Sequence, residues 1–488
     1  MASLVGSLSP ATVFASQVTG SSFVQDIFYA LATVCLLFVV AAIGLIDAGL
    51  VRRKNLLDTW VQKIVCALLA GFGMAVIGYA IWEAQYYQAF GTPNPVGQAI
   101  HDWWIFGPAL THFSQNLDPK LFPTADVYQI FVVFFVAYAM VGGALLHSAG
   151  LERVKALPMY VICLIAGAIV IPIALYYTWG STSPLTARGV HDYIGTYSLY
   201  VVVGVWALLI AWRAGPRLGA FSNHPRTIGP IPHNLGWSAA GVGILMFAAP
   251  FAFLGCGYFV PGSGYYGISL TTSGFGIVLV NMFMAYVGGG LSGALIAYKT
   301  RNPIMALIGV AAGYIGAGAS LDIGLPWQVF LVAFFASFVV YGMYLLLYRL
   351  RIDDKKIVPL ALGGGVYSAI VAGIVGNGDK TGGFFGLTGK YAAQHATISI
   401  GWQLIGLLVT LGIALVSGLV VIVGLEKTIG LRVTEEEEIV GLDQTYWQAP
   451  PSPYYDDPFA TATPSNETPT NGTAELVPEG VGPLPHPA

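Results

Sequence analysis

The sequence predicts an all-α integral membrane protein with eleven transmembrane helices. Of its 488 residues 56% are hydrophobic and only 9% are charged, whereas a soluble domain carries about a quarter charged residues. Apolar windows long enough to cross a hydrocarbon core of about 30 Å recur along nearly the whole chain. Each helix satisfies its own backbone hydrogen bonds in such a core, which isolated strands do not.

The apolar windows set the expected boundaries of the eleven segments. Gly and Pro interrupt several of them, which membrane helices tolerate better than soluble helices do. The expected segments are residues 26–50, 60–85, 127–149, 156–179, 191–212, 235–259, 266–298, 303–321, 326–348, 357–377 and 394–424.

The distribution of basic residues predicts the orientation in the cell membrane. Of the 21 Lys and Arg residues, 17 fall in loops on one side of the predicted topology. The other side holds only Lys120, Arg188, Lys380 and Lys390. Because cytoplasmic loops carry the excess of Lys and Arg, we expect the N-terminus outside and the C-terminus in the cytoplasm.

Composition divides the chain into four parts. Residues 1–25 form an extracytoplasmic tail; they lack the basic region of a secretory signal, although a cleaved leader remains an alternative. Residues 26–425 form the transmembrane domain. Residues 426–447, with the acidic run Glu435–Glu438, form a cytoplasmic regulatory segment. Residues 448–488 are rich in Pro, Thr and Ser, and we expect them to be disordered.

The motifs of common enzymes are missing from the sequence. There is no His-Glu-x-x-His metal motif, no phosphate-binding Gly loop and no spaced pair of acids. No basic stripe suggests nucleic acid. We therefore predict a protein that is not an enzyme and that uses no cofactor and no metal.

Polar side chains inside membrane segments are costly and are therefore functional candidates. Gln129, Asn281 and Gln403 are interpreted as interhelical hydrogen-bond formers. Asp192 either caps a helix or attracts a cation, and His147 is either an interfacial side chain or a proton relay. The full set is Asp47, Glu83, Gln129, His147, Asp192, Asn234, Asn281 and Gln403.

Trp179 belongs to an aromatic group at the end of the fourth segment, close to Tyr176 and Tyr177. If this group faces outward, its ring faces can bind a small cation. An interfacial anchor is the alternative.

Six short motifs, taken in order, resemble the ammonium transporter (Amt/Mep/Rh) family over residues 26–445. Each motif alone is weak, but six in the right order and topology are specific. They are Gly49–Asn55, Trp179–Gly180, Asp192–Thr196, Pro232–Asn234, Leu350–Asp354, and Gly430–Val433 followed by the acidic run and Gly441–Asp443.

The resemblance implies a fold and a set of site residues. The fold would be two inverted five-helix halves with an eleventh peripheral helix, assembled as a homotrimer in the lipid bilayer. Trp179 and Asp192 would serve ammonium recruitment, with Gly257 where the family has serine. Phe253 would be a pore gate. The C-terminal segment would be a docking site for a PII-type regulator.

The pore itself departs from the family pattern. The twin pore histidines would fall at Tyr200 and Leu362, and no His lies near either position. The first gate phenylalanine aligns with Val132, next to Phe131. Tyr is a poor proton relay near neutral pH and Leu is none, so we expect an apolar constriction at Leu362.

Three functions fit these observations. The first is an ammonium or ammonia transporter or channel that favours neutral ammonia. The second is a non-conducting ammonium sensor or regulatory subunit of the same fold. The third is a structural partner, or a carrier of another small neutral solute.

Overall fold

The computed structural model describes residues 20–111, 125–257, 267–271 and 273–449. Most of the two expected tails, residues 1–25 and 448–488, lies outside these ranges. The first helix begins at Gly20, six residues earlier than residue 26.

The predicted all-α architecture is confirmed. Within the described ranges, ten helical stretches are long and apolar enough to cross a membrane, and the shorter apolar helix Ile304–Ser320 corresponds to the expected segment 303–321. The ten are Val24–Leu50, Arg53–Ala89, Tyr128–Ala149, Ala156–Thr178, Thr196–Ala214, Leu235–Leu254, Phe275–Thr300, Pro326–Arg349, Val358–Val375 and Ile400–Thr428.

Several of these stretches are composites of shorter elements. The α-helices within the apolar segments are α2 (Gly20–Leu50), α3 (Leu56–Gly73), α4 (Tyr79–Ala89), α8 (Ala125–Ala149), α9 (Ala156–Ile165), α10 (Ile171–Thr178), α11 (Val202–Ala214), α12 (Leu235–Leu254), α13 (Phe275–Thr300), α14 (Ile304–Ala317), α15 (Pro326–Arg349), α16 (Gly364–Val375), α17 (Ile400–Gly418) and α18 (Gly424–Thr428). π-Helical turns join or begin them at η3 (Met74–Gly78), η4 (Ala166–Val170), η6 (Thr196–Val201), η8 (Val358–Gly363) and η10 (Leu419–Val423).

Short elements occupy the loops. Four are α-helices, four are 3₁₀ turns, and one is a two-stranded antiparallel ribbon in which Lys380 pairs with Thr397. They are α5 (Pro95–Trp103), α6 (Pro108–Thr111), α19 (Glu435–Val440), α20 (Leu442–Trp447), η2 (Arg53–Asn55), η5 (Thr186–Arg188), η7 (Gly318–Ser320), η9 (Gly389–Tyr391), β1 (Lys380–Thr381) and β2 (Ala396–Thr397).

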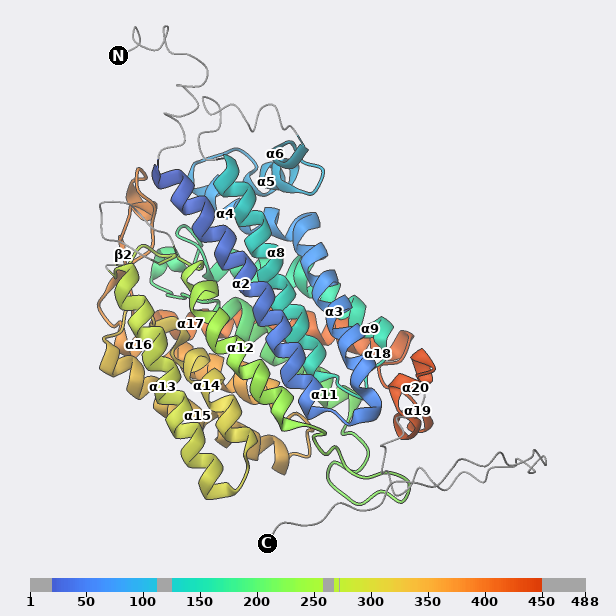
Figure 1. The fold of residues 1–488 in the computed structure, drawn as a ribbon. Helices are drawn as coiled ribbons and strands as arrows, with labels where there is room; N and C mark the ends of the chain where they lie inside the picture. Colours follow the sequence, from blue (N-terminus) through green and yellow to red (C-terminus); the bar gives the residue numbers. More distant parts are fainter. Residues whose placement is uncertain (1–19, 112–124, 258–266, 272, 450–488) are drawn as a thin grey trace, which may run out of the picture. The chain divides into compact units, whose positions relative to one another are not determined.

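The helix bundle has two distinct ends (Figure 1). We call the end that carries α19 and α20 the latch end, and the end that carries α5, α6 and the β1–β2 ribbon the cap end. Between them α2 packs against α8 and α12, α3 packs against α8, and α13 packs against α14 and α15. These helices enclose the central core.

The fifth segment begins as a helix at Thr196 and not at residue 191 as expected. Gly195 has a φ of +84°, a left-handed conformation that glycine adopts without a steric penalty. The chain therefore turns sharply before η6, and residues 191–195 form a loop that lies within the protein.

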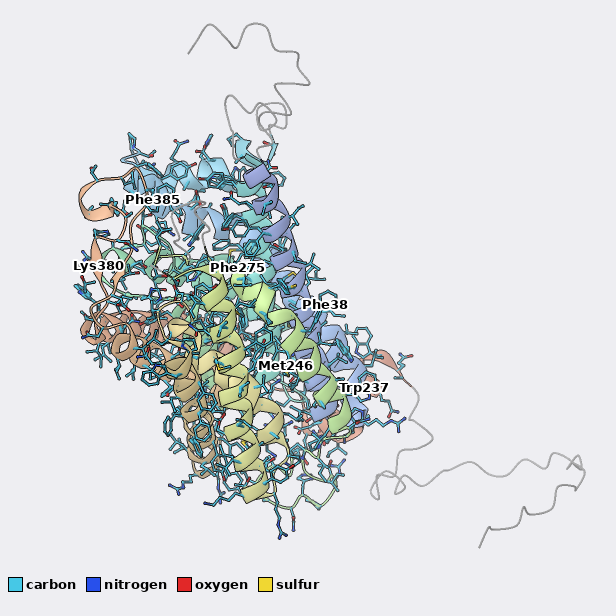
Figure 2. The ribbon with its side chains drawn as sticks, turned by 60° about the vertical axis from the view of Figure 1, so that its left-hand side comes forward. Phe38, Trp237, Met246, Phe275, Lys380 and Phe385 are labelled. Atoms are coloured by element: carbon cyan, nitrogen blue, oxygen red, sulfur yellow. The ribbon has the colours of Figure 1, made fainter. Side chains whose placement is uncertain are left out.

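The outward faces of the bundle are apolar, as membrane-facing surfaces require. Figure 2 shows Phe38 on α2 and Trp237 and Met246 on α12 along one side of the molecule. Their side chains are 47%, 47% and 42% exposed.

The contact between α13 and α14 depends on glycine. A Cβ on Gly293 would lie 2.6 Å from the Cα of Gly309, and a Cβ on Gly309 would lie 2.7 Å from the carbonyl oxygen of Gly289. A Cβ on Gly289 would overlap Gly309 and Gly313. Small residues of this kind let membrane helices approach closely.

We expect Gly289→Ala to lower the melting temperature of the detergent-solubilised protein, because the added methyl group overpacks this crossing at a cost of about 1–3 kcal/mol. Gly290→Ala is the matched control, since its Cβ would meet only Val310 Cγ2, at an ordinary 3.4 Å. Equal melting temperatures for the two variants would contradict the role assigned to the crossing.

Candidate functional site

The bundle core contains an elongated cavity of about 60 Å³ lined by 20 residues. Most of the lining is aliphatic. The polar or aromatic members are Tyr138, Tyr200, Phe253, Cys256, Tyr314 and Lys356.

The cavity runs along the membrane-crossing direction. Leu36, Val39, Ile43 and Ile46 of α2 all line it. These residues follow one another at helical spacing, and at 1.5 Å per residue they span about 15 Å of the helix axis. The cavity is therefore narrow and extends along α2, and we call it the conduit.

Aromatic rings lie toward the cap end of the conduit. Phe253, near the C-terminal end of α12, packs against Tyr314 with ring centroids 5.1 Å apart. Tyr138 on α8 is hydrogen-bonded through its hydroxyl to Ser198 Oγ at 3.0 Å. Phe253 thus lines the conduit, although its role as a gate remains a prediction.

Trp179 does not face outward as the sequence-based interpretation required. Its side chain is 1% exposed. Tyr138 stacks on its indole ring at 6.0 Å, and Phe135 meets it edge-on at 5.4 Å. Tyr176 and Tyr177 instead form a separate T-shaped pair. The aromatic group of Trp179 is thus internal, and it adjoins Tyr138 of the conduit wall.

Asp192 caps the turn that begins the fifth span, which is the first of the two interpretations given above. Its carboxylate accepts hydrogen bonds from the backbone N–H groups of Gly195, Thr196 and Tyr197 at 2.7 to 3.0 Å. Burial raises the pKa of Asp192 to about 6, because these three N–H groups only partly offset its lost hydration. Trp179 is tied to the same loop, since its Nε1 donates to the Tyr193 carbonyl at 2.9 Å.

The other predicted recruitment and gate residues lie outside this cavity lining. The Gly257 carbonyl accepts a hydrogen bond from the Tyr29 hydroxyl at 2.8 Å. Phe131 packs against Tyr29 with centroids 4.5 Å apart, and Val132 is buried in the core. Their functional roles remain predictions.

Of the two positions aligned with pore histidines, Tyr200 lines the cavity and Leu362 does not. Leu360 and Ala361 line it instead, while the Leu362 backbone packs against Gly204 of α11. The reason is the π-helical turn η8, whose wider winding rotates the side chains away from α-helical positions. Leu360 and Ala361 thus form an aliphatic part of the cavity wall, and the constriction expected at Leu362 remains a prediction.

Among the polar and aromatic residues of the cavity lining, sequence reasoning missed four: Tyr138, Cys256, Tyr314 and Lys356. Phe135 and Tyr138 are three residues apart, so the sequence predicts that they share one face of a helix. In the structure this face contacts Trp179. Lys356 was counted only as a loop charge, although it directly precedes an apolar segment. Tyr314 lay in a Gly-rich stretch and gave no distinct signal.

All three side chains expected to form interhelical hydrogen bonds bond to another segment of the chain. Gln129 bonds to a helix, whereas the backbone partners of Gln403 and Asn281 lie in loops. Gln403 on α17 donates to the His191 carbonyl at 3.0 Å and accepts from the His191 N–H at 2.9 Å. Asn281 on α13 donates to the carbonyls of Leu321 and Gly324. Gln129 on α8 donates to the Ala109 carbonyl in α6.

The remaining polar candidates lie elsewhere. Asn234 caps α12 by accepting from the Gly236 N–H. His147 Nδ1 and Glu83 Oε2 are buried and have no hydrogen-bond partner within the described ranges. Across the same ranges, no group of three or more His, Cys, Asp or Glu side chains converges as a metal site requires.

A buried ion pair links the Asp192 loop to the second half of the chain. His191 Nε2 lies 2.8 Å from Asp322 Oδ1, and both side chains are fully buried. Burial disfavours the charged imidazole, but the adjacent Asp322 carboxylate outweighs it and raises the pKa of His191.

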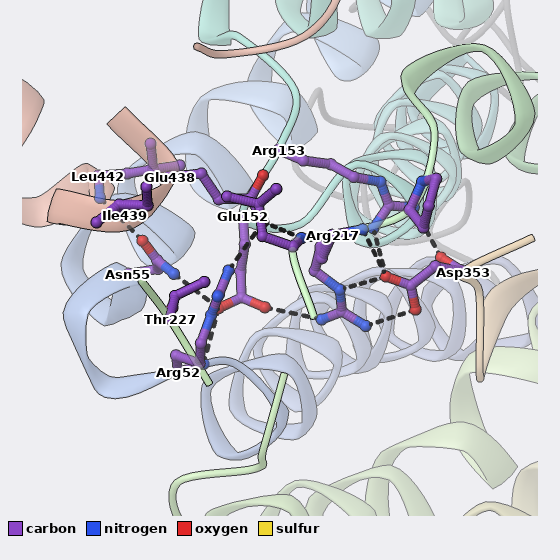
Figure 3. A network of polar contacts seen from close by, with 12 residues as sticks. Arg52, Asn55, Glu152, Arg153, Arg217, Thr227, Asp353, Glu438, Ile439 and Leu442 are labelled. Atoms are coloured by element: carbon purple, nitrogen blue, oxygen red, sulfur yellow. Dashed lines mark hydrogen bonds and ion pairs between the residues drawn. The ribbon is translucent and has the colours of Figure 1, made fainter. Parts of the chain in front are cut away.

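At the latch end, an ion network holds the C-terminal segment (Figure 3). Glu152, in the loop between α8 and α9, pairs with Arg52 at 2.9 Å and with Arg217 at 2.8 Å. Arg217 also forms a bidentate pair with Asp353 at 2.7 and 2.9 Å. Burial alone would raise the pKa of Glu152, but Arg52 and Arg217 hold it at about 2, so the network stays charged at neutral pH.

Residues 430–447, which we call the latch, attach directly to this network. Glu438 is fully buried; it accepts from Arg52 at 3.2 Å and from Arg432 at 2.7 Å. Asp443 accepts from the backbone N–H groups of Leu57 and Asp58 at 3.0 and 2.8 Å and so caps the start of α3.

We expect His191 to make thermal stability pH-dependent. Because its pKa is raised in the folded state, the stabilisation is fully present below about pH 6.5, the unfolded value. It is lost as pH rises through the folded pKa. The melting temperature between pH 6 and pH 9 should therefore fall in the wild type and fall less in His191→Gln. His101→Gln, whose ring is 69% exposed beside Asp102, is the control and should retain the wild-type slope.

We expect Glu438→Gln to release the latch, because removing one partner from a buried ion pair costs about 3–5 kcal/mol. Backbone amides of residues 434–447 should then exchange with deuterium at least about tenfold faster. Glu436→Gln is the matched control, since Glu436 is 71% exposed. Unchanged exchange in Glu438→Gln would show that the hydrogen bonds alone hold the latch.

The fold and the conduit can be compared with known proteins. The sequence model of the Ammonium Transporter Family matches residues 27–450. The ammonium transporter Amt1 of Methanocaldococcus jannaschii is 28% identical over 404 residues, which cover 80% of this chain and 94% of that protein. A solved structure named Sensor Amt Protein aligns with a TM-score of 0.69 and 20% identity over 87% of this chain and 98% of its own. The crystal structure of Mep2 of Candida albicans gives 0.66 and 20% over 85% and 87%. Because the family match extends over nearly all of the helical bundle, the chain belongs to the ammonium transporter family.

Proposed function

We propose that this protein conducts neutral ammonia across the cell membrane through the cavity between Phe253 and Lys356. The observation that carries the proposal is the cavity lining, whose 20 described residues include no histidine and no carboxylate. An ammonium ion would lose its hydration in such a wall without a compensating acceptor of charge. A neutral molecule such as ammonia loses far less hydration free energy when it enters the cavity.

We place the latch end in the cytoplasm and the N-terminus outside. The support is the excess of Lys and Arg in the loops at that end, several of which bind latch residues. In this orientation Trp179 and Asp192 contribute to ammonium recruitment at the outer side. Trp179 contributes its aromatic surface next to Tyr138, and Asp192 fixes the loop that holds it.

A sensor or regulatory subunit is the second candidate function. Two observations favour it: the likeness to a solved structure named Sensor Amt Protein, and the latch anchored to the loops that follow α2 and α11. A homotrimer, a PII-type regulator docking at the latch, and transport of another small neutral solute belong to the same proposal, supported by family membership.

The test is an ammonium jump applied to proteoliposomes, read as internal alkalinisation by stopped flow and as current on a solid-supported membrane. We expect faster alkalinisation than in protein-free liposomes and no current. A current in the wild type would contradict passage of the neutral molecule. Absence of both signals would favour the sensor, to be examined by ammonium binding.

Conduction through this cavity predicts the effect of filling it. Ile43 lines the conduit, and Ile43→Trp should slow alkalinisation about tenfold by closing an apolar constriction. Leu37, on the same helix, is 43% exposed on the outer face, so Leu37→Trp adds the same ring outside the conduit and should leave the rate unchanged. Equal rates in the two variants would place the path elsewhere.

A further inference from the structure

A buried cluster of charges borders the conduit at the latch end. Asp47, on α2, is fully buried and pairs with both Lys63 of α3 and Lys356 of the segment before η8. Its Oδ2 also accepts from Ser148 Oγ at 2.5 Å. Two cations thus share one carboxylate, and the elements that supply them come from both halves of the chain.

The two lysines differ in how their donors are used. Lys63 Nζ donates to Asp47, to the Ala144 carbonyl at 2.9 Å and to Ser148 Oγ at 2.8 Å, so its three N–H groups are all engaged. Lys356 Nζ donates to Asp47, and it forms no other hydrogen bond within the described ranges. Two of its three donors therefore remain for a solute or water.

Lys356 is also the lysine that faces the conduit. It is the only ionisable Lys, Arg, Asp or Glu among the 20 lining residues. The nearby Asp354 does not line the cavity, and its Oδ1 accepts from the backbone N–H groups of Lys356 and Val358. A solute that leaves the apolar wall toward the latch end therefore meets the ammonium group of Lys356.

We propose that Lys356 is a specificity-determining residue of the conduit: its ammonium group, anchored by Asp47, excludes cations and donates a hydrogen bond to the lone pair of a small neutral amine. An ammonium side chain has donors and no acceptor. Ammonia offers a lone pair to it, whereas an ammonium ion offers only donors and a charge of the same sign. Rings of basic side chains exclude cations from pores on the same principle.

This inference rests on the proposed function and needs a variant that removes the charge. Lys356→Met should let cations pass, because Asp47 stays paired with Lys63 while the charge facing the conduit is gone. Lys356→Arg retains a cation at the same position. Lys355→Met removes an equal charge one residue away, outside the lining, and is the matched control.

The experiment applies ammonium chloride jumps to proteoliposomes of each protein and records current and alkalinisation together. We expect Lys356→Met to carry a current about tenfold above protein-free liposomes, with alkalinisation retained. The wild type, Lys356→Arg and Lys355→Met should alkalinise without current. Lys356→Gln replaces Lys356→Met if the Met variant does not elute as a folded protein from gel filtration.

The outcomes separate the two proposals. Wild-type alkalinisation with no current in Lys356→Met or Lys356→Gln overturns the role of Lys356 and leaves neutral conduction intact. A current in the wild type, or an equal current in Lys355→Met and Lys356→Met, also overturns that role. Absence of alkalinisation in the wild type removes the proposed function and this inference with it.

Discussion

The structure depends on how its few buried charges are paired. Glu152 alone brings together Arg52 of the first loop and Arg217 of the loop after α11, and Arg217 extends the network to Asp353 before η8. Isolated charges in a low-dielectric interior are prohibitively costly, so each of these groups must find its partner for the others to be tolerated. The network thereby fixes the latch-end loops of both halves of the bundle, and these loops in turn set where the conduit helices begin.

Asp47 follows the same rule inside the bundle, with a different result. In the Glu152 network two acids meet three arginines in a region where the protein closes on itself. Around Asp47 one acid meets two lysines, and one of these borders the cavity. Both clusters contain one more basic than acidic group, but only the Asp47 cluster borders the cavity, through Lys356, so we assign a function to Lys356 and a structural position to Lys63.

Hydropathy predicted the helical spans because burial in a membrane imposes a simple pattern on sequence. The third segment, expected at 127–149, is observed at Tyr128–Ala149. Local conformation was less accessible. The helix of the fifth span starts five residues later than expected, because Gly195 is left-handed and Asp192 accepts hydrogen bonds from three backbone N–H groups. Hydropathy does not predict either feature. The site was predicted in part, since Tyr200 and Phe253 line the cavity. Leu362 does not line it, because it lies in the π-helical turn η8. The burial of Trp179 depends on aromatic residues that are 40 or more positions away in the sequence.

The backbone between Asp353 and Lys356 joins the two charge systems over three residues. Asp353 forms an ion pair with Arg217, and Arg217 also pairs with Glu152. Glu152 pairs in turn with Arg52, which pairs with Glu438 in the latch. Lys356, which lies on the same short stretch, forms an ion pair with Asp47 beside the cavity. The chain of contacts is continuous, so a displacement of the latch is transmitted to the cavity wall through ion pairs and a few peptide units. The C-terminal latch and the wall of the cavity are therefore joined by ion pairs and one short stretch of backbone.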